Sequence, residues 1–158
     1  MLGKTYDSQV CSIARSLELV GERWSLLIIR DALFARVTRF SDFQHNLGIA
    51  TNVLTSRLES FVASGIMDHR GAAEYVLTPK GHALAVALIA LTEWGDEWAS
   101  PIDPPILYRH TVCDGEVHAA AACETCGTVP ADEIGIRIGP GMPPEYLAAR
   151  RGGSRATA

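Results

Sequence analysis

Residues 41–65 constrain the fold more than any other stretch, because their pattern predicts two helices with almost no chain between them. Ser41 is followed three residues later by Gln44, the pattern of a capping box, so a short helix is expected with Ser41 as its N-cap. Gly48 suits the left-handed position that closes such a helix. A second helix is predicted over residues 51–63, with Gly65 ending it. A helix, a tight turn containing glycine and a second helix form a helix-turn-helix arrangement.

The flanking segments predict the rest of the domain. Two short extended segments joined by Gly71-Ala-Ala predict a β-hairpin, and Thr78 followed by Pro79 favours the start of another helix. A helix-turn-helix followed by a hairpin at this separation is a winged helix-turn-helix, a mainly α fold with a small β-hairpin. The further expected elements are helices over residues 11–20, 23–35 and 79–99 and strands over residues 66–70 and 74–77.

The last predicted helix is apolar on nearly every side between Ala83 and Leu91. The core of one domain covers only one stripe of such a helix, so the other stripe needs a partner. A second copy of the chain is the simplest partner, and the sequence therefore predicts a homodimer.

The helix predicted over residues 51–63 has two different faces. Apolar side chains gather on one side, whereas the opposite side carries short side chains that form hydrogen bonds. Such a face allows a helix to lie deep in the DNA major groove, where Asn pairs with adenine and residues near the helix start reach the bases first. Arginines beside this face suit DNA phosphates. The predicted DNA-binding residues are Arg39, Ser41, Thr51, Asn52, Thr55, Ser56, Arg57 and Arg70.

Other functions are weighed against DNA binding. A polar helix face can simply face water, and Glu59 on the same face repels phosphates. The net charge of −4 also argues against a nucleic-acid partner, although residues 30–57 hold four arginines and two carboxylates, and a dimer doubles this basic region. The alternative is a winged-helix adaptor that binds proteins without specific DNA binding. No enzyme is expected, because no catalytic nucleophile pattern and no phosphate-binding loop occur.

A cluster of cysteine and histidine follows the winged helix. His110-x-x-Cys113 and Cys123-x-x-Cys126 have the layout of a zinc ribbon, in which each pair supplies two of four tetrahedral ligands. The sequence predicts one structural Zn²⁺ per chain, with His118 as a competing fourth ligand. Two alternatives stay open, namely a ribbon without metal and a redox-active pair of Cys123 and Cys126.

Composition predicts three regions. Residues 1–100 are expected to form the DNA-binding and dimerisation domain, residues 101–138 a small zinc-ribbon-like extension, and residues 139–158 a flexible tail rich in Gly, Pro and Arg. The sequence has no apolar run of eighteen residues and no secretory signal pattern. We therefore expect a cytoplasmic protein without a membrane partner.

Several separated motifs occur in order along residues 9–99. They are Arg23-Trp24, Arg39-Phe40-Ser41-Asp42, Asn52-x-Leu54-x-x-Arg57-Leu58 and Leu77-Thr78-Pro79-Lys80-Gly81. In this set the chain resembles the HxlR-type winged helix-turn-helix transcriptional regulators. The resemblance implies a homodimer formed through the first and last helices of the domain, a palindromic DNA operator and a regulatory role, which we take to be repression. It also implies a response to a small molecule, an electrophile or an oxidant.

The resemblance also assigns a candidate sensor. Cys11 stands where redox-sensing members of this family are similar in carrying an N-terminal cysteine, and Arg15 one turn later is expected to favour its thiolate. The alternative is a buried structural cysteine. The chain departs from the family in two places. Ala50 replaces a common capping Ser, so Thr51 is expected to cap the second helix, and the hairpin is too poor in basic residues to contribute much beyond Arg70.

Overall fold

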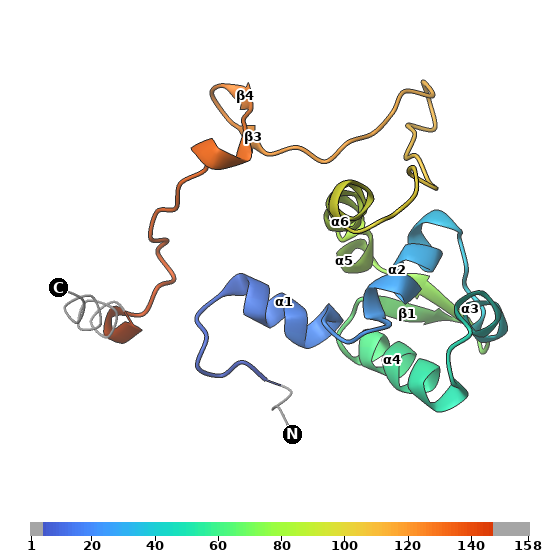
Figure 1. Cartoon of the computed structure of the whole chain (residues 1–158). Helices are drawn as coiled ribbons and strands as arrows, with labels where there is room; N and C mark the ends of the chain where they lie inside the picture. The colour runs from blue at the N-terminus through green and yellow to red at the C-terminus, as the bar shows by residue number, and fades with distance from the viewer. Residues whose placement is uncertain (1–4, 147–158) are drawn as a thin grey trace. The chain divides into compact units, whose positions relative to one another are not determined.

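The computed structural model of the 158-residue chain describes residues 5–146 (Figure 1). Contacts divide the chain into two compact units. The larger unit is Leu19–Ala120, and the smaller unit combines, within the described residues, 5–18 and 121–146. Residues 101–120 therefore group with the helical unit. The end of the predicted tail, residues 147–158, lies outside the described residues. None of the helices within residues 5–146 has the length and apolar character needed to cross a membrane.

The order of elements follows the predicted one, and the mainly α fold with a small hairpin is confirmed. The smaller unit contains β3 (Ala122–Cys123), β4 (Gly127–Thr128) and the 3₁₀ helix η1 (Ala131–Glu133), and α1 (Ser12–Val20) begins in it. The larger unit contains α2 (Ser25–Phe34), α3 (Phe40–Leu47), α4 (Thr51–Ala63), β1 (Met67–Arg70), β2 (Glu74–Leu77), α5 (Pro79–His82) and α6 (Ala85–Trp98).

The hairpin is held to the connector between α2 and α3. β1 and β2 pair antiparallel, with Arg70 opposite Glu74. Arg39 forms an isolated bridge to Glu74, and the backbone N–H of Tyr75 donates a hydrogen bond of 2.7 Å to the carbonyl oxygen of Thr38. The chain therefore leaves the edge of the hairpin and enters α3 directly.

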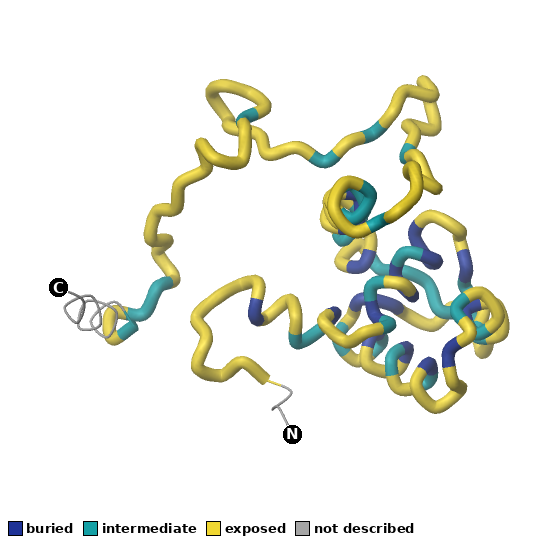
Figure 2. Tube along the Cα trace, viewed as in Figure 1, coloured by how far each residue is buried: buried dark blue, intermediate teal, exposed yellow. Residues whose placement is uncertain are grey.

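The hydrophobic core lies among α2, α3, α4 and the chain leading into β1. Figure 2 shows the buried residues concentrated in these elements, whereas the trace after α6 is mostly exposed. Burial of this apolar surface is the main stabilising contribution to the winged helix-turn-helix. The fully buried apolar side chains are those of Ile28, Ile29, Phe43, Leu54, Leu58, Phe61, Ile66 and Met67.

Two predicted helix caps are wrong. α3 begins at Phe40 with Arg39 as its N-cap, and the Ser41 hydroxyl donates to the Asp42 carboxylate at 3.1 Å instead of capping the helix. α4 has Ala50 as its N-cap, and the Thr51 hydroxyl accepts a hydrogen bond of 2.7 Å from the Gln44 amide. In α3 the cause is tertiary, because the bridge to the hairpin holds Arg39 extended and fixes where the helix begins. Gly48 does close α3 in the left-handed conformation, at φ 60°.

The single long helix predicted over residues 79–99 is divided into α5 and α6. Thr78 caps α5 as predicted, because its hydroxyl accepts the N–H of Gly81 at 3.3 Å. After α5 ends at His82, the N–H of Leu84 donates a hydrogen bond of 3.2 Å to the carbonyl oxygen of Gly81. This bond spans three residues instead of four, so the regular α-helix is interrupted here. α5 is thereby a short docking turn against the hairpin, and α6 starts anew at Ala85.

Candidate nucleic-acid interface

The two faces of α4 are those predicted from the sequence. Leu54, Leu58 and Phe61 are fully buried in the core, whereas Asn52 and Ser56, one turn apart, are exposed. α3 precedes α4 with only residues 48–50 between them and packs against it. α4 is therefore held rigidly by one face while its polar face is open to a partner.

The two threonines at the start of α4 already have hydrogen-bond partners. The Thr51 hydroxyl accepts from Gln44 of α3 at 2.7 Å, which ties the two helices together. The Thr55 hydroxyl donates to the backbone carbonyl of Thr51 at 2.9 Å, one turn back. Asn52 and Ser56 are thus the two predicted base-contacting residues that are exposed and whose side chains form no hydrogen bond to another residue within the described part of the chain.

The predicted arginines are held by neighbouring carboxylates. The Arg57 guanidinium lies 3.9 Å from the Glu22 carboxylate, and its side chain is only 19% exposed. The Arg39 guanidinium lies 3.9 Å from the Glu74 carboxylate, but its side chain is 67% exposed. Exposed pairs at this distance are weak and exchange easily. Arg39 is therefore the arginine better placed to contact a DNA phosphate.

The loop before α2 contributes a part of this surface that the sequence did not predict. Glu22, Arg23 and Trp24 line a shallow hollow together with Asn52 and Ser56 of α4. The Arg23 guanidinium lies over the Trp24 ring, 5.4 Å from its centroid, which is the geometry of a cation–π contact. The Arg23-Trp24 motif was the available signal, although its position beside α4 depends on the fold.

The hairpin places its basic residue away from α4. Arg70 is exposed at the end of β1, opposite Glu74. It lines a hollow with Arg36 and His82 rather than with the residues of the recognition face. The structure thus brings Asn52, Ser56 and Arg57 to one surface and leaves Arg70 on another.

In the smaller unit, Cys11 directly precedes α1 and is exposed, so the alternative of a buried structural cysteine is wrong. The Arg15 guanidinium binds the Glu18 carboxylate at 2.8 Å and donates to the carbonyl oxygens of Tyr6 and Gln9, and its expected effect on the Cys11 thiol stays a prediction.

The predicted metal ligands are all exposed, and the three cysteines are free thiols. His110 Nδ1 lies 3.1 Å from Cys113 Sγ in the larger unit. In the smaller unit, hydrogen bonds from the backbone of Thr125 and of Cys126 lower the pKa of the Cys123 thiol. Within residues 5–146, three or more side chains of His, Cys, Asp or Glu are nowhere gathered as a metal site.

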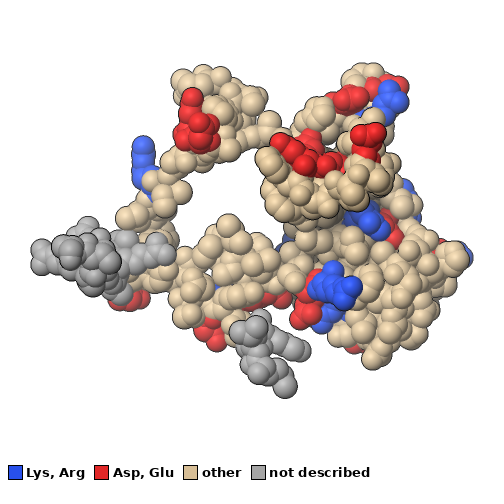
Figure 3. All heavy atoms as spheres, in the orientation of Figure 1, with Lys and Arg blue, Asp and Glu red and all other residues tan. Residues whose placement is uncertain are grey.

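The competing ligand His118 has other partners. Its Nδ1 lies 2.9 Å from a Glu93 carboxylate oxygen of α6, and its Nε2 lies 3.5 Å from Glu116. Figure 3 shows Asp and Glu side chains gathered over the region of α6, and Glu93, Asp96, Glu97 and Glu116 lie together there.

Known proteins share this architecture. The HxlR-like helix-turn-helix family matches residues 19–103. The HTH-type transcriptional regulator Rv3095 of Mycobacterium tuberculosis is 41% identical over 139 residues, which cover 83% of this chain and 87% of Rv3095. The crystal structure of PA1607, which is assigned as a transcription factor, is 32% identical, with a TM-score of 0.71 over 83% of this chain and 96% of its own. Quinone-bound YodB of B. subtilis is 26% identical, with a TM-score of 0.50 over 56% of this chain and all of its own.

These similarities differ in how far they extend. YodB covers little more than the winged helix, whereas Rv3095 and PA1607 cover 83% of the chain and therefore share part of the region outside residues 19–103. Because the family match spans more than half of the chain and Rv3095 aligns over most of both proteins, the chain belongs to the HxlR-like helix-turn-helix family of DNA-binding transcriptional regulators.

Proposed function

We propose that the protein is a cytoplasmic, homodimeric repressor that places α4 in the major groove of a palindromic operator. The observation that carries the proposal is the division of α4 into a fully buried face and an exposed polar face beginning with Asn52. A helix fixed in this way presents its N-terminal residues to the base edges. Asn52 pairs with an adenine, and the Ser56 hydroxyl, one turn further along α4, accepts or donates a hydrogen bond to a base edge.

The residues proposed to contact the DNA backbone surround this face of α4. Arg39, with its side chain largely exposed, binds a phosphate, and Ser41 and Thr51 at the starts of α3 and α4 add hydroxyl contacts. Arg57 exchanges the Glu22 carboxylate for a phosphate when DNA arrives. Thr55 supports the helix, and Arg70 contributes least.

DNA selection tests this assignment. The full chain is used to select duplexes from a random pool, and the affinity for the selected site is then measured for Asn52→Ala and for Asn46→Ala. Asn46 is the matched control because it is an exposed asparagine in α3. Losing one bidentate base contact reduces specific affinity by about 5- to 150-fold, which corresponds to about 1–3 kcal/mol.

Two outcomes decide between the regulator and an adaptor. Selection of a defined site, with a large loss in Asn52→Ala and little change in Asn46→Ala, supports recognition by α4. Selection of a site that both variants bind equally well would place recognition elsewhere. Failure to select any site, together with weak binding that salt abolishes uniformly, would favour the winged-helix adaptor.

The dimer is proposed from the apolar surface of α6. Leu91, Trp94 and Trp98 follow one another at intervals of three and four residues and are 51%, 58% and 68% exposed. This stripe lies on the side of α6 away from the buried Leu88 and Ile89, which is the pattern of a helix that packs against a second partner. Ile13 and Leu17 give α1 an exposed stripe of the same kind.

Sedimentation tests the dimer. Trp94→Glu is expected to give monomers that bind the operator weakly, whereas Val112→Glu, at an apolar position that is 85% exposed in the segment after α6, is expected to remain dimeric. A dimeric Trp94→Glu protein would contradict the α6 interface.

Two regulatory features complete the proposal. The exposure of Cys11 supports its role as an oxidant sensor, and the quinone-bound state of the similar YodB fits an electrophile as effector. The zinc ion expected from the sequence stays part of this proposal, because each unit by itself offers donors that Zn²⁺ prefers: Cys113 beside His110 in the larger unit, and the thiols of Cys123-x-x-Cys126 in the smaller one.

A further inference from the structure

We propose that the cavity between α6 and residues 104–118 binds a small organic cation with an apolar body, and that this ligand regulates the repressor. The inference concerns a ligand site within the larger unit and builds on the proposed regulatory function. Four observations support it: a fastened strap, a cavity of suitable size, its charge, and the apolar surface on the opposite side of α6.

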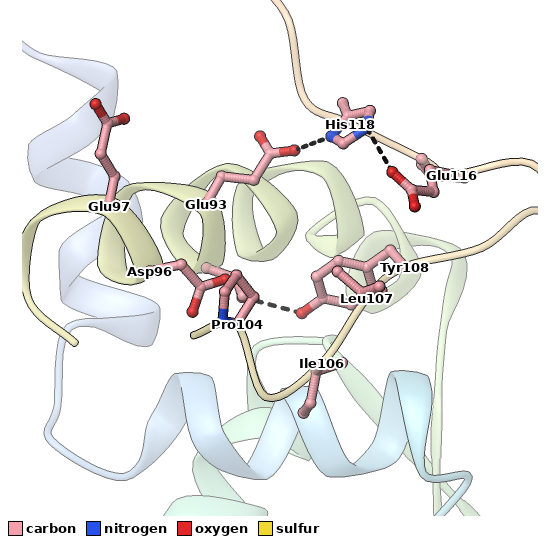
Figure 4. Close-up of a pocket in the computed structure, with 11 residues that line it drawn as sticks. Glu93, Asp96, Glu97, Pro104, Ile106, Leu107, Tyr108, Glu116 and His118 are labelled. Carbon is pink, nitrogen blue, oxygen red and sulfur yellow. Dashed lines mark hydrogen bonds and ion pairs between the residues drawn. The ribbon is translucent and has the colours of Figure 1, made fainter. Parts of the chain in front are cut away.

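Residues 104–118 form a strap that side chains fasten to the helices. The Tyr108 hydroxyl lies 3.0 Å from the Thr92 hydroxyl of α6, and the Tyr108 ring contacts the Phe34 ring of α2, with 4.7 Å between centroids. Further along the strap, the His118 Nδ1 atom lies within hydrogen-bonding distance, 2.9 Å, of a Glu93 carboxylate oxygen of α6. The strap has almost no regular structure of its own, so these side-chain contacts hold its course (Figure 4).

The cavity between the strap and α6 is partly open to solvent and has the dimensions of a ligand site. Its volume is about 320 Å³, at the lower end of the range of about 300–1,000 Å³ found for small-molecule pockets. Pro104, Ile106, Leu107 and Val117 supply apolar walls, and Tyr108 adds an aromatic ring. An apolar body of about ten heavy atoms fits such a space.

The polar groups around the cavity select the charge of its ligand. Glu93, Asp96 and Glu97 come from successive turns of α6, and Glu116 comes from the strap (Figure 4). Among the described residues that line the cavity, none is Lys or Arg. Four carboxylates beside an apolar pocket repel anions and attract a cation, whose charge can also lie against the Tyr108 ring.

His118 contacts two of these four carboxylates. It lies between Glu93 and Glu116, so that it joins the helix to the strap. A ligand ammonium group that binds Glu93 or Glu116 competes with this imidazole. Ligand binding therefore alters the contact that holds the strap to α6.

The opposite side of α6 can couple ligand binding to DNA affinity, because it carries the proposed dimer surface. The cavity uses Thr92, Glu93 and Asp96, whereas Leu91, Trp94 and Trp98 form the exposed stripe assigned to the dimer. A ligand that shifts α6 relative to α2 therefore changes the dimer surface and with it the spacing of the two recognition helices. The ligand can shift this equilibrium only as far as its affinities for the two positions of α6 differ.

Calorimetry on the full-length protein tests the site with three probes of similar size, namely benzyltrimethylammonium, benzyl alcohol and phenylacetate. The cation is expected to bind at least about tenfold more tightly than the alcohol, since several carboxylates act on it, and phenylacetate is expected to bind most weakly. Equal affinities for the three probes, or no binding of the cation at about 10 mM, would overturn the proposal.

Variants locate the binding. Asp96→Asn and the cavity-filling Val117→Trp are each expected to weaken binding of the cation by about tenfold or more. Asp68→Asn, which removes the same charge from the hairpin, is the matched control and should bind like the wild type. Binding that survives both Asp96→Asn and Val117→Trp in proteins with unchanged circular dichroism would place the ligand elsewhere.

A second measurement separates this inference from the function on which it rests. Affinity for the selected operator is measured with and without saturating benzyltrimethylammonium, and a several-fold change that Val117→Trp abolishes is expected. Operator binding that the cation does not alter would overturn the regulatory role while leaving the DNA-binding function intact. Cation binding in a protein that selects no DNA site would show the reverse.

Discussion

Gly81 allows a quantitative test of how α5 docks against the hairpin. A Cβ atom at this position would lie 2.4 Å from the carbonyl oxygen of Ile66 and 2.7 Å from Cδ2 of Leu77. Ordinary contacts begin about 1 Å further out. Gly81→Ala is therefore expected to push α5 away from the chain that enters β1, although alanine is the better helix former.

Three contributions set the size of the effect. Forcing the backbone apart costs about 1–3 kcal/mol, as in other overpacked cores. The same movement stretches the hydrogen bonds from the Thr78 hydroxyl to the Gly65 carbonyl and from the Lys80 ammonium to the Ser64 carbonyl, both 2.7 Å long, which contribute about 1 kcal/mol each. Helix propensity offsets about 1 kcal/mol. The free energy of unfolding should therefore fall by about 2–4 kcal/mol.

The matched control is Gly95→Ala in α6. Nothing lies within 4 Å of a Cβ atom added there, so only the gain in helix propensity remains, and the free energy of unfolding should rise by about 0.5–1 kcal/mol. Urea unfolding followed by circular dichroism, at one protein concentration because a dimer's stability depends on it, measures both changes. Two substitutions that shift stability in the same direction would refute the packing argument.

Three further predictions concern the cysteines. Purified protein is expected to contain about one zinc ion per chain that Cys126→Ser loses, and a metal-free wild type with ordered residues 110–126 would contradict the ribbon. The lowered pKa of Cys123 favours its thiolate, so in metal-free protein near neutral pH iodoacetamide should modify Cys123 faster than it modifies the same cysteine in a short peptide, with the advantage vanishing as pH rises above the thiol pKa of the peptide; equal rates at every pH would count against those hydrogen bonds. Diamide should alter operator affinity in the wild type but not in Cys11→Ser, and an unchanged response would exclude Cys11 as the sensor.

Local patterns were sufficient for the helix-turn-helix and the hairpin. The apolar spacing of Leu54, Leu58 and Phe61 identified the buried face of α4, and Gly48 and Thr78 marked a helix end and a helix start, because each of these signals acts within one or two turns. The capping residues of α3 and α4 were misassigned, and at α3 the reason is that the position of Arg39 is decided by the hairpin far along the chain.

The surroundings of the candidate sites were less predictable for the same reason. His118 was interpreted through its spacing to the cysteines, but its partner Glu93 is 25 residues away in sequence. The contact of Phe34 with Tyr108 joins elements that no local pattern connects. The cavity beside α6 depends on these distant contacts, and sequence alone gave no indication of it.

The ion pairs of Arg39 with Glu74 and of Arg57 with Glu22 bear on how such a protein searches a genome. Every stretch of DNA offers phosphates, and about 10⁶–10⁹ wrong sites compete with each operator. In a chain of net charge −4, arginines that are already paired with their own glutamates gain less from a phosphate than unpaired arginines would. Giving up these weak pairs lowers the affinity for random DNA and for the operator by the same factor, so the choice between wrong and right sites falls to the base contacts proposed for Asn52 and Ser56.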